Sequence, residues 1–78
     1  MPTVLWHGPF RVFFYAGDRD EPAHVHVERE GRVAKFWLDP VRLERSGGFK
    51  RAEIAEVYRI LLKHRAEFVE AWNDYFNG

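Results

Sequence analysis

Apolar and polar residues alternate through the middle of the chain, from residue 24 to residue 38. Successive side chains of a β-strand point to opposite faces, so this alternation predicts two strands that are each apolar on one side. If Glu30-Gly31 forms a two-residue turn between them, the apolar residues of both strands share one face of a hairpin. Those residues are Val25, Val27, Ala34, Phe36 and Leu38. We expect this face to form part of the core.

The opposite face of the predicted hairpin has an unusual composition. In the same register His26 lies across from Lys35, and His24 lies across from Trp37. A strand face that only meets solvent does not require two imidazoles beside an amine and an indole. We expect this face to remain accessible, and it is the first candidate for a functional site.

Two further patterns complete the predicted fold. The β-rich runs at residues 3–7 and 10–15 predict a first hairpin, and residues 41–43 form either a short edge strand or a half-turn. Apolar residues then recur at spacings of three and four from residue 50 to residue 77, which predicts one long helix. They are Ile54, Tyr58, Leu61, Phe68, Val69, Trp72 and Phe76. We therefore expect an α+β fold in which a small antiparallel four-stranded sheet of two hairpins packs against one long C-terminal helix.

The predicted helix is long for so small a sheet. No Gly or Pro interrupts it, so it would span about 42 Å, whereas strands of about seven residues span about 23 Å. The helix would then overhang the sheet, and its exposed end, with Trp72, Tyr75 and Phe76, would suit a homodimer or another protein partner. The alternative is that the helix curves over the first hairpin and buries these rings.

Composition sets outer limits on the function. At 78 residues the chain predicts one domain, residues 1–78, with the sheet in residues 1–45 and the helix in residues 50–77. Lys plus Arg equals Asp plus Glu at 12 each, so no overall field attracts nucleic acid, acidic ligands or membranes. The absence of cysteine excludes disulfides and thiolate chemistry. With no signal-peptide pattern and no membrane-spanning apolar run, we expect a cytoplasmic protein.

His24 and His26 suggest metal binding, because strand residues at i and i+2 lie on one face and both imidazoles can reach one ion. A third ligand would come from Glu28 or from an acid of the loop at residues 18–21. Lys35, expected across from His26, opposes a bound cation. We therefore expect no metal and no other cofactor, with His24, His26 and Glu28 as the ligands of the alternative.

The same residues also suit acid-base chemistry. An imidazole titrates near pH ~6.5, so His24 and His26 beside Lys35 can move a proton and stabilise a phosphoryl negative charge. This set suits metal-independent RNA cleavage, in which the 2′-hydroxyl of the substrate is the nucleophile. The alternative is that the two imidazoles only pack or meet solvent.

Arg65 is the fourth catalytic candidate. Its position within the apolar stripe of the helix predicts a buried guanidinium, which needs a partner, and Asp39 is the expected one. The alternative is that the side chain extends out of the stripe and keeps its charge in water.

A binding surface is the other interpretation of the mixed face. Rings and basic groups on a sheet can stack unpaired nucleotides, and aromatic residues with arginine also anchor protein interfaces. Because the net charge is zero and the face carries few bases, we favour a protein partner over nucleic acid. The residues of this surface are Arg11, Phe13, His24, His26, Lys35 and Trp37.

Several motifs of the chain resemble one protein family. They are Met-Pro-Thr-Val at the start, Pro-x-His-x-His-Val at residues 22–27, Ala-Lys-Phe-Trp-Leu-Asp-Pro at residues 34–40, and His64-Arg65 followed by Ala71-Trp72-Asn73. In combination they resemble the short prokaryotic proteins filed as domain of unknown function 4160 (DUF4160), over essentially the whole chain. Family members often have a second proline at the position of Ala23 and Ser-Pro at that of Lys50-Arg51.

The resemblance implies a role rather than a reaction, because the family has no settled activity and therefore no catalytic residues to carry over. Such proteins look like partners of another small protein encoded beside them, an arrangement similar to toxin-antitoxin pairs. We therefore expect a small partner-binding or regulatory protein. The alternatives are a metal-independent ribonuclease and a protein that binds a transition metal through His24 and His26.

Overall fold

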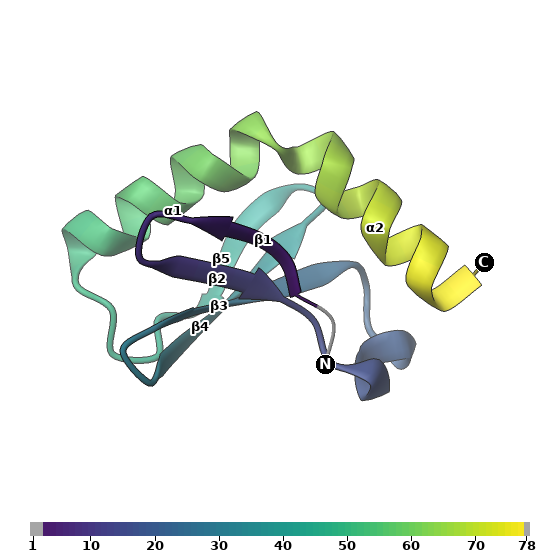
Figure 1. The fold of residues 1–78 in the computed structure, drawn as a ribbon, viewed down its shortest axis with the longest axis horizontal. Coiled ribbons are helices and arrows are strands. Elements are labelled where there is room, and N and C mark those ends of the chain that lie inside the picture. The colour runs from purple at the N-terminus through teal and green to yellow at the C-terminus, as the bar shows by residue number, and fades with distance from the viewer. Residues whose placement is uncertain (1–2, 78) are drawn as a thin grey trace.

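Five antiparallel strands form one sheet in the order β1-β2-β3-β4-β5, and two α-helices run along one side of it (Figure 1). The computed structural model describes residues 3–77, so Met1 and Pro2, which begin the family motif, and Gly78 lie outside the described residues. The strands are β1 Thr3–His7, β2 Phe10–Phe13, β3 His24–Arg29, β4 Arg32–Leu38 and β5 Val41–Arg45. The helices are the 3-10 helix η1 Ala16–Asp20 and the α-helices α1 Arg51–Lys63 and α2 Arg65–Asn77. The expected α+β fold with an antiparallel sheet is confirmed.

The central hairpin has the register that the alternation predicts. Val27 pairs with Ala34, and His26 pairs with Lys35. Glu30 and Gly31 both have positive φ, at 53° and 79°, as a two-residue turn matched to the strand twist requires. The register therefore separates the apolar residues of β3 and β4 from the imidazoles, as expected.

The predicted number of strands is wrong, because β5 adds a fifth strand to the sheet. Leu38 pairs with Val41 across the tight Asp39-Pro40 turn, whose peptide bond is cis, and Phe36 pairs with Leu43. Val41 is the one buried residue of β5, and the rest of the strand is exposed. So polar a strand carries little hydrophobic signal in the sequence, and the pairing with β4 is what defines it.

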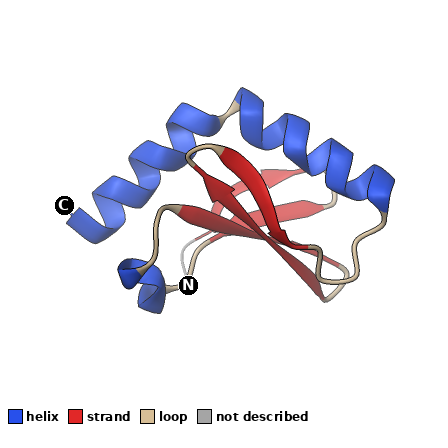
Figure 2. Ribbon diagram, turned by 180° about the vertical axis from the view of Figure 1, so that it is seen from behind, coloured by secondary structure: helices blue, strands red, loops and turns tan. Residues whose placement is uncertain are grey.

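The predicted single long helix is also wrong, because the helix bends at His64. This residue has φ −108° and ψ 17° and separates α1 from α2. Its N–H still donates to the Ile60 carbonyl, and its carbonyl still accepts from the Phe68 N–H, so few backbone hydrogen bonds are lost at the bend. Beyond it α2 turns down over the end of the sheet (Figure 2), which buries Phe68 and Trp72.

The core lies between the helices and the face of the sheet that the alternation selects. All five apolar residues expected on that face are fully buried, and they pack with residues of β2, α1 and α2. The main helix contributors are Val57, Ile60, Leu61 and Phe68. The close packing extends to the loop after β5, where a β-carbon on Gly47 would lie 1.7 Å from the Val33 carbonyl oxygen.

Two arginines of the central hairpin, Arg29 and Arg32, form ion pairs with Glu53 at the start of α1. Glu53 accepts hydrogen bonds from both Nη atoms of Arg32, at 2.9 and 3.0 Å, and lies 3.1 Å from Nη1 of Arg29. It also accepts from the backbone N–H of Lys50 at 2.8 Å, which caps the helix. These hydrogen bonds, chiefly that from Arg32, lower the pKa of Glu53 to about 2.

Candidate functional site

His24 and His26 lie in a covered cluster rather than on an open face. Their exposed fractions are 0% and 5%, so the expectation that the imidazole-bearing face remains accessible is wrong. The segment that leads into η1 folds back over this face, and the centroid of the Tyr15 ring lies 4.6 Å from that of the His26 ring. The Trp72 ring of α2 lies 4.9 Å from that of His24. Both covering groups depend on tertiary contacts that the alternation of β3 does not encode.

Asp18 is the third member of this cluster. Its Oδ2 atom lies 3.1 Å from Nε2 of His24 and 3.1 Å from Nε2 of His26. The carboxylate is fixed by the first turn of η1, where it accepts a hydrogen bond of 2.8 Å from the Tyr15 N–H. We call these three side chains the Asp18–His24–His26 cluster. It lies on the face of the sheet opposite the core that the helices cover.

The hydrogen bonds of His24 determine its tautomer. Its Nδ1 lies 2.9 Å from the Pro22 carbonyl oxygen, which can only accept, so Nδ1 carries a hydrogen. Its Nε2 is buried and has no hydrogen-bond partner, although the Asp18 oxygen is only 3.1 Å away. In a neutral ring this places a nitrogen lone pair beside a carboxylate oxygen.

His26 has one satisfied and one unsatisfied nitrogen. Its Nε2 forms a hydrogen bond of 3.1 Å with Oδ2 of Asp18, whereas its buried Nδ1 has no partner. Burial is the main cause that lowers the pKa of His26, and it outweighs the opposing effect of Asp18. The Phe13 ring stacks on the imidazole at 5.5 Å. His26 therefore lies in a buried, aromatic environment that disfavours its charged form.

Lys35 pairs across the hairpin with His26 but directs its amine elsewhere. Its Nζ lies 2.5 Å from Oε1 of Glu21 and 4.7 Å from the centroid of the Trp37 ring. The hydrogen bond from Lys35 is the main cause that lowers the pKa of Glu21. The charge of Lys35, which we expected to oppose a bound cation, is thus balanced by the carboxylate of Glu21.

Arg11 and Glu28 form a separate pair on the same face. The Nε and Nη2 atoms of Arg11 donate to Oε1 of Glu28 at 3.0 and 2.8 Å, and the guanidinium lies 4.3 Å from the centroid of the buried Phe13 ring. Glu28, which the sequence offers as a metal ligand, is therefore held by Arg11. The carboxylate beside the two histidines is that of Asp18 instead. It belongs to the loop at residues 18–21, the other predicted source of a third ligand.

Arg65 has the predicted partner in a different environment. Its Nη2 lies 2.5 Å from Oδ1 of Asp39, and its Nε donates to the Leu38 carbonyl at 2.8 Å. The side chain is 40% exposed, so the expectation of a buried guanidinium is wrong. These contacts place Arg65 at the turn between β4 and β5 rather than beside the imidazoles.

The ribonuclease interpretation, which needs His24, His26, Lys35 and Arg65 to act together, remains a prediction. The structure brings two of these four side chains together and directs the other two to Glu21 and Asp39. Both imidazoles are buried, so a substrate could reach them only if the side chains that cover them, among them Tyr15 and Trp72, moved.

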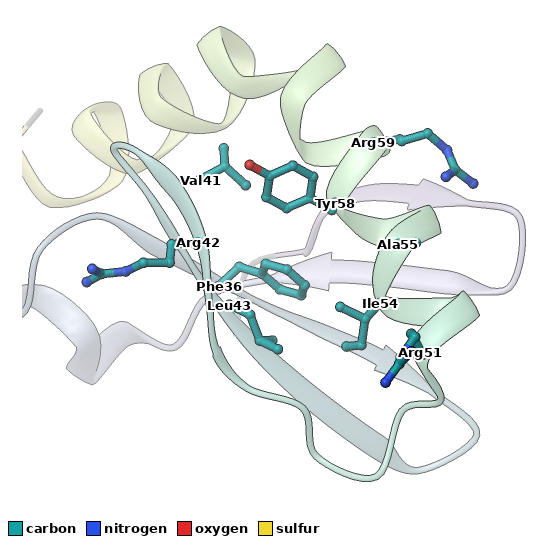
Figure 3. Close-up of a pocket in the computed structure, with 9 residues that line it drawn as sticks. All are labelled: Phe36, Val41, Arg42, Leu43, Arg51, Ile54, Ala55, Tyr58 and Arg59. Atoms are coloured by element: carbon teal, nitrogen blue, oxygen red, sulfur yellow. The ribbon is translucent and has the colours of Figure 1, made fainter.

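A second feature is an open groove between β5 and α1, with a volume of about 480 Å³. Figure 3 shows Ile54 and Tyr58 pointing from α1 towards Phe36 and Leu43 of the sheet. We call it the β5–α1 groove, and it is lined by Phe36, Val41, Arg42, Leu43, Arg51, Ile54, Ala55, Tyr58 and Arg59. The sequence does not predict this groove, because it expects Tyr58 in the core and leaves β5 undecided.

The β5–α1 groove combines exposed apolar area with unpaired cations. Leu43 and Tyr58 each remain 39% exposed. Within residues 3–77, none of the three arginines at its edge has an ion-pair partner. They are Arg42, Arg51 and Arg59. The groove is therefore apolar in its floor and positive at its edge.

Comparison with known proteins gives a family and no function. A family model described as "Domain of unknown function (DUF4160)" matches residues 10–73. No curated protein and no solved structure matches the chain. Within the part of the chain that the structure describes, no helix is long and apolar enough to cross a membrane.

Proposed function

The chain belongs to the DUF4160 family, whose description assigns no activity, and from this premise we propose that it is a small partner-binding protein. In this proposal the β5–α1 groove takes a strand-forming, acidic segment of another small protein. The resemblance to proteins encoded beside a second small protein supports a regulatory role within such a pair, of the toxin-antitoxin kind.

The observation that carries the proposal is an edge strand beside an open apolar groove. Among the described residues 3–77, β5 pairs only with β4, so its outer edge offers backbone N–H and carbonyl groups to a further strand. A peptide that adds to a sheet edge gains affinity from these main-chain bonds and specificity from pockets for alternate side chains. The exposed parts of Leu43, Ile54 and Tyr58 supply such an apolar pocket.

The charge at the edge of the groove selects the kind of segment. Arg51 and Arg59 extend from α1, and Arg42 lies on the other face of β5 (Figure 3). A partner strand that alternates apolar and acidic residues would bury its apolar side chains in the groove and present its carboxylates to Arg42 on the other face of β5, while Arg51 and Arg59 add positive charge along α1. Exposed charges of this kind mainly accelerate association and exclude wrong partners, so binding should weaken as salt is added.

The experiment uses two synthetic peptides that alternate valine with glutamate or valine with lysine. We expect the glutamate peptide, in titrations followed by two-dimensional NMR, to shift the amide signals of β5 and of the α1 residues along the groove. Leu43→Glu should weaken this binding at least tenfold. The matched control is Leu62→Glu, since Leu62 is also an exposed apolar residue and lies on α1 outside the groove lining.

Three results would overturn the proposal. One is a shift pattern that maps to the opposite face of the sheet, and another is equal binding of the lysine peptide. The third is a homodimer, seen by light scattering, that Leu43→Glu dissociates, because the groove would then belong to a second copy of the chain.

A further inference from the structure

We propose that the Asp18–His24–His26 cluster binds one divalent first-row transition metal ion, such as Zn²⁺ or Co²⁺. The ligands are Oδ2 of Asp18, Nε2 of His24 and Nε2 of His26. The site lies on the opposite face of the sheet from α1, so this inference is independent of partner binding in the β5–α1 groove.

The spacing of the three ligand atoms fits one ion. The carboxylate oxygen lies 3.1 Å from each imidazole nitrogen, and all three atoms lie within 4.8 Å of one another. Metal–ligand distances of about 2.0 to 2.2 Å separate neighbouring ligands by about 3.0 Å at right angles and about 3.4 Å at tetrahedral angles. The two nitrogen-to-oxygen distances fall in this range, and the two imidazole nitrogens, which lie within 4.8 Å of each other, would come to the same separation around a bound ion.

The tautomer of His24 is the one that metal binding requires. A histidine that ligates through one nitrogen usually donates its other N–H to a carbonyl or carboxylate. His24 donates from Nδ1 to the Pro22 carbonyl, which leaves the lone pair of its fully buried Nε2 directed into the cluster. A buried acceptor without a partner, beside a carboxylate oxygen, is unfavourable unless a cation or a proton lies between them. An ion bound there would satisfy both atoms.

The surroundings of the cluster support its affinity for a cation. The Tyr15 N–H fixes the carboxylate, and aromatic rings pack around the imidazoles. The charge of Lys35 is balanced by its ion pair with Glu21, and the carboxylate of Asp18 lies beside both imidazoles. Three protein ligands leave a fourth coordination position, which a water molecule would fill.

The test uses protein without an affinity tag, stripped of metal with a chelator and then titrated with Co²⁺ and Zn²⁺. We expect one ion per chain by calorimetry and a visible Co²⁺ absorption spectrum of a site with nitrogen and oxygen ligands. Asp18→Asn should lower the affinity at least 100-fold. Glu28→Gln should leave it unchanged, because Glu28 pairs with Arg11 and not with the imidazoles.

Two controls keep the result specific to this cluster. The exposed His7 and the half-buried His64, whose rings are 6.5 Å apart, form the other histidine pair, so the double variant His7→Gln, His64→Gln must still bind one ion. Circular dichroism must show that Asp18→Asn is folded, and His26→Gln serves as a second ligand variant. Equal affinity of folded Asp18→Asn, or no binding of either metal, would overturn the proposal. So would an NMR signature of doubly protonated His24 in protein that binds no metal, because the cation in the cluster would then be a proton.

Discussion

Replacing Trp72 with alanine tests whether this side chain anchors α2 over the end of the sheet. The indole is 6% exposed and lies 4.9 Å from the His24 ring, 5.6 Å from the Phe14 ring and 4.4 Å from the Phe76 ring. Truncating a buried tryptophan costs about 3 to 5 kcal/mol. A domain of this length has a total free energy of unfolding of about 4 to 12 kcal/mol. Trp72→Ala should therefore remove about a quarter of the stability or more.

The assay is thermal unfolding followed by circular dichroism, with Tyr75→Ala as the matched control. Tyr75 lies three residues after Trp72 in α2 and is 48% exposed. Its truncation therefore removes less buried area than truncation of Trp72. At about 4 to 8 °C per kcal/mol for a domain of this size, Trp72→Ala should lower the melting temperature by about 12 °C or more. Tyr75→Ala should lower it by less than half as much. If the two variants melt within about 4 °C of each other, Trp72 is not the anchor of α2 and the explanation of the bend is wrong.

Three further predictions concern other parts of the fold. The pKa of Glu53 is about 2, against an ordinary 4.5, so its contribution to stability is complete above pH ~4.5 and is lost as the pH falls towards 2. In urea unfolding, the stability of Glu53→Gln should lack this part of the dependence on pH. A stability that depends on pH as in the unchanged protein would contradict the assignment. Gly47→Ala should destabilise the fold far more than Gly8→Ala. Both glycines have positive φ, but only at Gly47 would an added β-carbon collide with a backbone atom, the Val33 carbonyl oxygen. Equal urea midpoints of the two variants would contradict this. Arg65→Met should cost only about 1 kcal/mol in urea unfolding, since its ion pair is half-exposed, and a loss above about 3 kcal/mol would show that the guanidinium is effectively buried.

The central hairpin could be predicted from the sequence because its signals are local. The alternation of β3 and β4 and the Glu30-Gly31 turn determine together which residues face the core. The partner of Arg65 could be predicted as well, since Asp39 follows β4 directly and an arginine in an apolar stripe requires an acceptor. The exposure of Arg65 could not, because it depends on where α2 lies after the bend.

The bend and the covered cluster depend on contacts that no local pattern contains. His64 is neither glycine nor proline, so nothing in the sequence marks the end of α1 there. The burial of His24 and His26 requires Tyr15, which precedes η1, and Trp72 of α2 to pack against β3, and these segments are far apart along the chain. The sequence nevertheless includes Asp18 among the acids that could join the histidines. It could not distinguish Asp18 from Glu28, because that choice depends on the pairing of Arg11 with Glu28.

The two-residue period of β3 also limits how the gene of this protein can vary in length. A single inserted codon within His24–Arg29 would exchange the two sides of the strand downstream of it, moving valines out of the core and polar side chains into it. The same insertion in the loops before or after the hairpin would leave both sides in place. Insertions and deletions among natural variants should therefore collect outside these six residues.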